Sequence, residues 1–529
     1  MYLDGKIYMG LSQDGERVNM SLPMCNRHGL IAGASGTGKT ITMKCMAESF
    51  ADAGVPVFLC DVKGDVSGLC VPGVSNEGME KRIDRFGLRD VFQYKAYTTT
   101  FWDIYGENGH PIRATVSDMG PELLSRILGL TAAQEGVLNI LFRIADDHGL
   151  KLIDLKDLKA MISYVGDHKD DYILTYGNIA QQSLGGILRA LLPLETQGGD
   201  LFFGEPDLDI HDWIRTDSNG KGMINLLDSV RLVQNPKLYS MFLLWMMTEL
   251  FEVLPEAGDA AKPKLVFFFD EAHMLFTDAP SVLVQKIEQV VKLIRSKGVG
   301  IYFVTQSPSD IPDSVLAQCS NRVQHALRAY TPAEQKAVRS AAQAFRVNPA
   351  FKAEDVIMEL GVGEALVSFL DDEGVPGIVQ RTKIICPQSL MAQADPVSRA
   401  AMFQSDGMSK YDQMVDNESA YEIIQGKKAE DEERAKLEAE RLAFEKEKAE
   451  YEKQKAKEEE AARKKAEKEA EAARKKAEKE AEAARKKREK EEEAERKKAA
   501  ARKAKIESQL ISAGGQVLKR GLLGLLKKR

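Results

Sequence analysis

A glycine-rich motif near the amino terminus constrains this chain more than any other feature. Residues 33–40 read GASGTGKT and fit the phosphate-binding pattern GxxxxGK[ST] at every fixed position. A short apolar run, 30–32, precedes the motif, and a helical pattern, 41–48, follows it. The glycines let consecutive backbone N–H groups face an anion at the start of that helix. The expected nucleotide contacts are Gly33, Ala34, Ser35, Gly36, Thr37, Gly38, Lys39 and Thr40.

Two side chains of this loop have predicted roles. Lys39 is expected to reach the β- and γ-phosphates of a nucleotide, and Thr40 to place its hydroxyl on Mg²⁺. The sequence therefore predicts ATP and Mg²⁺ as cofactors.

Paired carboxylates give a second signal of a nucleotide site. Five consecutive apolar residues, 265–269, predict a strand buried on both faces, and Asp270-Glu271 ends it. With a phosphate-binding loop upstream, Asp270 is expected to hold Mg²⁺ through water. Glu271 is expected to orient and polarise the attacking water. His273 is open to either a structural or a catalytic role.

A polar residue ends the next predicted strand, 299–306. Gln306 stands where it would lie beside the γ-phosphate, so it is a candidate sensor of that phosphate. The helix 281–297 joins this strand to the preceding carboxylates.

The order of the predicted elements indicates an α/β fold with mainly parallel strands. A second strand, 55–61, follows the helix of the phosphate-binding loop, which completes a strand–helix–strand unit. From about 118 to 205 the pattern is helical and suggests an insertion. We expect a hairpin in 1–28, an ATPase domain in 29–390 and a linker in 391–426.

The carboxyl-terminal part has a different chemistry. Residues 427–505 are almost wholly Glu, Lys, Arg and Ala, and an 11-residue unit starts at Ala461 and recurs at Ala472. All four residue types favour helix, and a heptad seam exists only in fragments. We therefore predict a charged single helix or a weak coiled coil in 427–505, and favour the single helix over a strong coiled coil. The last stretch, 506–529, is apolar and basic and is predicted to dock a partner, touch an anionic membrane surface or pack onto the ATPase body.

Composition limits the class of protein. The net charge of −7 over 529 residues argues against a protein that coats nucleic acid, although a local basic loop would not show in this total. No run of about 18 apolar residues exists, and the first residues do not resemble a signal peptide. The cysteines form no CxxC pair, which suits a reducing compartment. We expect a soluble, cytoplasmic protein. The cysteines are Cys25, Cys45, Cys60, Cys70, Cys319 and Cys386.

Taken together, these motifs resemble the HerA/FtsK superfamily of P-loop ATPases, most closely the bacterial YjgR-like group of HerA-like proteins. The resemblance covers residues 1 to about 390. It implies a RecA-like sheet, a ring that is usually hexameric, and ATP-driven movement of double-stranded DNA. The motifs that carry it are the loop at 33–40, DVKGD at 61–65, LLD at 226–228, DEAH at 270–273, RSKG at 295–298 and TQ at 305–306.

The resemblance also implies roles for individual residues. Lys39, Thr40, Asp270, Glu271 and Gln306 match the motor motifs position by position. Arg295 stands where HerA motors have an arginine that meets nucleotide phosphates, in its own subunit or across an interface. Arg322 and Arg328 are the next candidates, and a surface salt bridge is the alternative for each arginine.

We therefore predict a ring-shaped homo-oligomeric motor, most simply a hexamer, that hydrolyses ATP and acts as a DNA translocase or helicase-like protein. Its partner would be double-stranded DNA. The alternative is an ATP-switched assembly protein that recruits a protein partner through its carboxyl-terminal helix without moving DNA.

Overall fold

The computed structural model describes residues 1–510 apart from 259 and 278, with side chains to residue 502. The chain forms two compact units, 1–428 and 429–529. The stretch predicted to be apolar and basic lies outside the described residues from position 511 onward. Among the residues that are described, no helix has both the length and the apolar character needed to cross a membrane.

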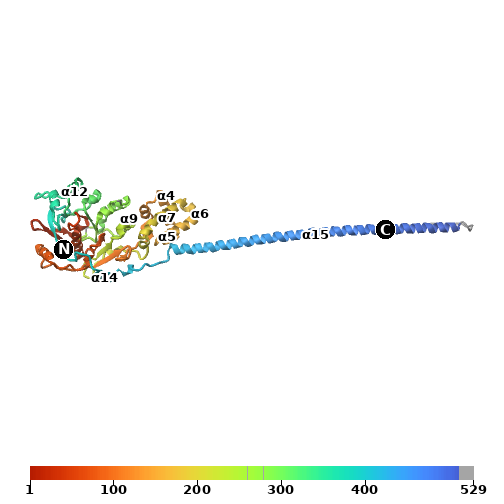
Figure 1. Cartoon of the computed structure of the whole chain (residues 1–529), viewed down its shortest axis with the longest axis horizontal. Helices are drawn as coiled ribbons and strands as arrows, with labels where there is room; N and C mark the ends of the chain where they lie inside the picture. Colours follow the sequence, from red (N-terminus) through yellow and green to blue (C-terminus); the bar gives the residue numbers. More distant parts are fainter. Residues whose placement is uncertain (259, 278, 511–529) are drawn as a thin grey trace. The chain divides into compact units, whose positions relative to one another are not determined.

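The first unit is built on one large sheet (Figure 1). Within the described residues the sheet has 13 strands, and its central part is parallel. The order across that part is β11, β4, β10, β9, β5, β8 and β6. The P-loop strand β4 is therefore an interior strand. The bounds are β4 Gly29–Ala32, β5 Val57–Asp61, β6 Thr99–Asp103, β8 Ile224–Asp228, β9 Leu265–Phe269, β10 Val299–Thr305 and β11 Asn321–Gln324.

Alternating side chains of the parallel strands pack into two different cores. In β9, Phe267 and Phe269 face one core, while Val266 and Phe268 face the other. The first core is closed by α9 (Pro236–Val253) and α10 (Ser281–Leu293), and the second by α1 (Lys39–Asp52). Because both faces are covered, these strands are continuous apolar runs.

A block of helices lies between the short strand β7 (His110–Pro111) and β8. Thr115, Thr131 and Asp154 begin three of these helices with reciprocal capping boxes, which satisfy the first backbone N–H groups. Their apolar faces join the core beneath α9. The helices are α3 Val116–Leu128, α4 Ala132–Asp147, α5 Leu155–Asp167, α6 Lys169–Tyr176 and α7 Gln181–Leu194.

The amino-terminal hairpin is an edge of the main sheet. Strands β2 (Lys6–Ser12) and β3 (Arg17–Ser21) pair as predicted, and β13 (Gln380–Ile384) pairs with β2. β12 (Glu364–Ser368) joins β13 to the parallel strands through β11. Residues 371–375 form a turn in which Asp371 N–H donates to the Val375 carbonyl at 3.0 Å.

The predicted linker, residues 391–426, packs onto the rest of the first unit. We call this segment the strap. The strap contains α14 (Pro396–Ser405), and its Tyr411 side chain is buried. His110, from β7, lies between two strap carboxylates: Nδ1 is 2.5 Å from Asp412 and Nε2 is 3.0 Å from Asp406. The strap is rich in polar residues, so sequence alone did not indicate that it would be held by a buried histidine.

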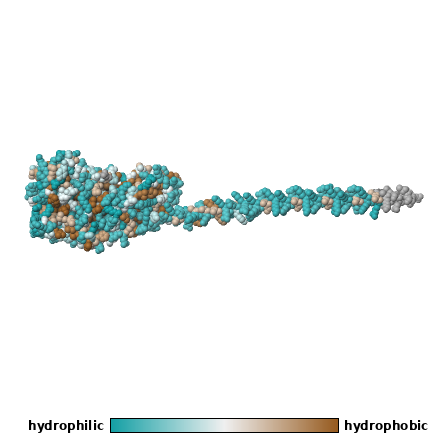
Figure 2. All heavy atoms as spheres, in the orientation of Figure 1, coloured by the Kyte–Doolittle hydropathy of each residue, from teal (hydrophilic) through white to brown (hydrophobic). Residues whose placement is uncertain are grey.

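The described part of the second unit, from residue 429 to residue 510, belongs to the helix α15 (Ala420–Leu510). Ion pairs between Glu and Lys four positions apart recur along it at an 11-residue spacing, and side chains 432–502 are exposed. Figure 2 shows mostly hydrophilic atoms along this helix. The described part of α15 is thus a helix with a charged, exposed surface, and the choice between a single helix and a weak coiled coil stays a prediction. The recurring pairs are Glu460–Lys464, Glu471–Lys475, Glu482–Lys486 and Glu493–Lys497.

The His110 contact predicts a pH-dependent stability. Burial opposes the charged imidazole, but the hydrogen bonds of Asp406 and Asp412 outweigh it and raise the pKa of His110 above 6.5. The resulting stability is complete below the unfolded pKa and is lost as the pH rises through the folded pKa. Calorimetry at about pH 6 and about pH 8 should show a lower Tm at the higher pH.

The variant His110→Gln should lose most of this difference, whereas His148→Gln, at an exposed histidine, should keep it. An unchanged pH dependence in His110→Gln would show that another group is responsible.

Candidate active site

Three parallel strands bring the predicted site residues to one edge of the sheet. β10 pairs with β4 so that Thr305 lies opposite Ala32, and with β9 so that Phe303 lies opposite Phe269. The next residues along each chain are the P-loop, Asp270-Glu271 and Gln306. Because the carboxyl ends of parallel strands share an edge, these groups converge.

The P-loop is a cradle that side chains would fill. A Cβ added at Gly33 would lie 2.5 Å from the Cβ of His325, and Gly38 adopts a left-handed φ of 112°. The loop is tied to its surroundings by backbone bonds: Gly33 N–H donates to Thr305 O at 3.2 Å, and Gly363 N–H donates to Thr37 O at 3.0 Å. This rigid, glycine-lined turn at the start of α1 fits a phosphate chain.

Lys39 already points into the loop. Its Nζ donates to the carbonyl oxygens of Gly33 at 2.7 Å and Ala34 at 3.2 Å. Burial lowers the pKa of this lysine, and the charges of Glu271 and Asp270 oppose that change. A buried ammonium held by two neutral carbonyls is available to a stronger, anionic acceptor such as a phosphate.

His325 supports the loop from below, a role that the sequence did not predict. Its Nδ1 donates to Glu364 O at 2.9 Å, so Nε2 accepts a hydrogen bond from the Thr42 hydroxyl, also at 2.9 Å. Burial lowers the pKa of His325 to about 4, so the ring is neutral. His325 therefore links α1 to β11 and β12 beneath the P-loop.

Asp270 has the environment of a cation ligand. It is 3% exposed, and its Oδ2 has no hydrogen-bond partner in the part of the chain that the structure describes. Burial raises its pKa to about 7. A buried carboxylate oxygen without a donor is costly unless a cation or proton satisfies it. Oxygen ligands suit Mg²⁺, so Asp270 and Thr40 fit the ion that accompanies a nucleotide.

Glu271 is held beside Asp270 by several groups. Its backbone is left-handed (φ 45°), and its side chain is buried. Lys63 forms an ion pair with Oε1, while Gln306 Nε2 donates to Oε2 at 3.3 Å and His273 Nδ1 lies 3.2 Å from Oε2. Burial favours a higher pKa, but Lys63 above all outweighs it and lowers the pKa of Glu271. Gln306 and His273 thus both reach the predicted catalytic carboxylate.

Arg295 is not brought to this edge. It lies in a 3-10 turn, Ile294–Lys297, just before the amino end of β10, so the seven residues of that strand separate it from Gln306. At about 3.3 Å per residue this separation is roughly 20 Å, too far for contact with its own subunit's nucleotide. Arg295 instead lines a cavity of about 740 Å³ together with Arg27, which the sequence did not single out.

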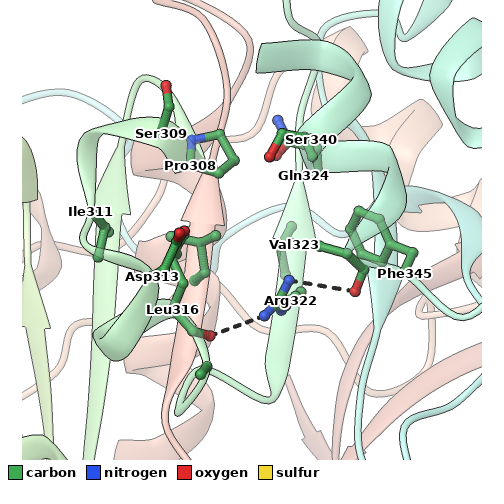
Figure 3. Close-up of a pocket in the computed structure, with 14 residues that line it drawn as sticks. Pro308, Ser309, Ile311, Asp313, Leu316, Arg322, Val323, Gln324, Ser340 and Phe345 are labelled. Atoms are coloured by element: carbon green, nitrogen blue, oxygen red, sulfur yellow. Dashed lines mark hydrogen bonds between the residues drawn. The ribbon is translucent and has the colours of Figure 1, made fainter. Parts of the chain in front are cut away.

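The other two arginines bind backbone carbonyls. Arg322 donates to Cys319 O and Leu316 O, each at 2.9 Å, and to Ala344 O at 3.4 Å beside a pocket of about 370 Å³ (Figure 3). Arg328 donates to Met358 O at 3.0 Å. The guanidinium of Arg322 is thus committed to its own fold.

Comparisons with known proteins identify relatives. A family model described as helicase HerA-like C-terminal matches residues 7–529. The bacterial conjugative coupling protein TrwB superposes with a TM-score of 0.49 at 15% identity, over 75% of this chain and 92% of TrwB. VirB4 of Thermoanaerobacter pseudethanolicus gives 0.45 at 16% identity, over 75% and 99%. Both TM-scores are below 0.5, so TrwB and VirB4 resemble this chain only distantly. A search of curated proteins found no significant match.

Among the described residues, no group donates a hydrogen bond to Oδ2 of Asp270. We therefore predict that removing the charge of this side chain weakens metal-dependent nucleotide binding. Asp270→Asn should weaken nucleotide binding in the presence of Mg²⁺ by about tenfold or more, because a charged ligand is replaced by a neutral one. Binding without Mg²⁺ should change little. Titration of a fluorescent ATP analogue with and without Mg²⁺ measures both.

Asp313→Asn, at a carboxylate beside the pocket of Figure 3, is the control. An equal loss with and without Mg²⁺ in Asp270→Asn would contradict the assignment of Asp270 as the metal ligand.

Proposed function

Because the chain belongs to the helicase HerA-like family of P-loop ATPases, we propose that it is an ATP-hydrolysing ring motor that moves double-stranded DNA. One observation carries the proposal. The residues of the expected nucleotide site follow the carboxyl ends of the parallel strands, and Arg27 and Arg295 lie at their amino ends beside one cavity. Subunits that meet head to tail would bring one edge against the other, and such contacts form a ring when the rotation between subunits closes.

The chain's own residues account for the hydrolytic step. The P-loop N–H groups and Lys39 would bind the phosphates, and Asp270 and Thr40 would hold the metal. When bound, Mg²⁺ would supply positive charge that offsets the charge of the phosphates. Glu271 orients the attacking water and takes up its proton, and Gln306 Nε2 holds its Oε2.

The experiment for this function measures ATP turnover with and without double-stranded DNA, together with the mass of the particle. We expect a hexameric mass and a turnover that DNA stimulates, with the stimulation falling as salt increases. Turnover that a protein partner stimulates and DNA does not would contradict the DNA motor. It would instead support the ATP-switched assembly protein, which would use the exposed side chains of α15.

Glu271→Gln should separate binding from hydrolysis. The amide retains the shape of the side chain but cannot take up a proton, so turnover should fall by about a hundredfold or more while nucleotide affinity stays within about twofold. Steady-state rates and analogue titrations measure the two quantities. Glu252→Gln, at an exposed glutamate, is the control. Parental turnover in Glu271→Gln would remove this residue from the mechanism.

Arg295 should act on the nucleotide of a neighbouring subunit. Arginines of this kind contribute roughly 10³–10⁵ to turnover, so Arg295→Ala should bind ATP normally and hydrolyse it very slowly. Lys39→Ala should fail to bind. Mixing the two variants places an intact P-loop beside an intact Arg295 at some junctions, and activity should partly return.

Arg339→Ala, at an exposed arginine of α12 (Pro332–Gln343), should behave like the parent. No recovery after confirmed subunit exchange would contradict action across the interface. Full activity of Arg295→Ala alone would contradict any role for Arg295.

A further inference from the structure

Lys63 is presented to the site by a fixed turn. The carboxylate of Asp61, at the end of β5, accepts backbone N–H bonds from Gly64 at 2.7 Å, Asp65 at 3.2 Å and Val66 at 3.1 Å. These bonds close the turn that carries Lys63, and Gly64 provides its left-handed residue (φ 75°). The backbone position of Lys63 is therefore set by the scaffold.

The chain that enters the strap holds the residues that directly follow this turn. Leu390 N–H donates to Val71 O at 2.9 Å, and Ala394 N–H donates to Ser67 Oγ at 3.1 Å. A side chain at Gly68 would collide with the carbonyls of Leu390 and Ala392. The segment that follows Lys63 is thus packed without room to shift.

Both oxygens of Glu271 are engaged by neighbouring side chains. Lys63 Nζ pairs with Oε1, and Oε2 accepts from Gln306. The Lys63 side chain is 44% exposed, whereas that of Glu271 is 6% exposed. Lys63 therefore contacts a buried carboxylate from the solvent side. A carboxylate that must accept a hydrogen bond from an attacking water needs a free lone pair in the right direction, and Lys63 occupies one of its oxygens.

We propose that Lys63 is a positioning residue that restrains Glu271 in a resting orientation, so that Glu271 must leave Lys63 before it can orient the attacking water. The inference rests on the proposed function, because it requires Glu271 to act on that water. The turn that carries Lys63 is held by the Asp61 carboxylate, and Glu271 is bonded on its other oxygen by Gln306. The ion pair therefore has to break before Oε1 of Glu271 is free, and part of each catalytic cycle is spent breaking it.

Replacing Lys63 by an uncharged side chain of similar length tests the restraint. Lys63→Met should raise kcat about three- to tenfold, the range that the loss of one partly exposed ion pair allows, and leave KM unchanged. Lys63→Arg retains the charge and should keep the parental rate. The affinity for a non-hydrolysable ATP analogue, measured without Mg²⁺, should be the same in all three proteins. Lys292→Met, at an exposed lysine of α10, is the matched control.

The role of Glu271 is tested separately in the same series. The double variant Lys63→Met/Glu271→Gln should be as slow as Glu271→Gln alone, because Lys63 acts only through the carboxylate. If Glu271→Gln is inactive and Lys63→Met hydrolyses ATP at or below the parental rate, the restraint is overturned while the proposed function stands. If Glu271→Gln is fully active, the proposed role of Glu271 fails, and the restraint fails with it. Lys63→Gln, with an unchanged Tm as the criterion of folding, repeats the test with a polar side chain.

Discussion

The buried carboxylate of Asp270 is the constraint on which the site depends. It ends a strand whose side chains are all buried, and one of its oxygens has no donor among the residues described. Leaving such an oxygen unsatisfied costs free energy, and that cost is offset when a cation binds. The flanking strands β4 and β10 place a glycine cradle and an amide at the same edge, so the cation and the phosphates it accompanies share one position.

The two edges of the parallel sheet have opposite chemistry. The carboxyl edge carries Lys39, Asp270 and Glu271, and we propose that it receives phosphate and metal. The amino edge carries Arg27 and Arg295 beside an open cavity. A monomer therefore lacks the arginine that the family resemblance implies at its own site. Assembly would complete the site, which gives a physical reason why hydrolysis by this chain should depend on its neighbours.

The local sequence was sufficient to predict the site residues that directly follow a strand. The P-loop, Asp270, Glu271 and Gln306 each follow an apolar run, and parallel pairing brings them together. The supporting contacts could not be predicted, because they join residues far apart in the chain. His325 meets Thr42 across 283 positions, and His110 meets Asp406 across 296. The same limit applies to Arg295, whose motif suggested a phosphate contact but could not say at which edge the residue lies. The polar composition of residues 391–426 likewise concealed the single buried ring that Tyr411 contributes.

A structure of the full chain bound to Mg²⁺ and a non-hydrolysable ATP analogue tests the central claim most directly. The account predicts that the phosphates lie in the loop formed by residues 33–40, that Lys39 Nζ has left the carbonyls of Gly33 and Ala34 for phosphate oxygens, and that the metal lies beside Asp270 Oδ2. A nucleotide bound elsewhere would contradict it. So would a metal without Asp270 in its surroundings, or a Lys39 still bonded to the loop carbonyls with nucleotide present.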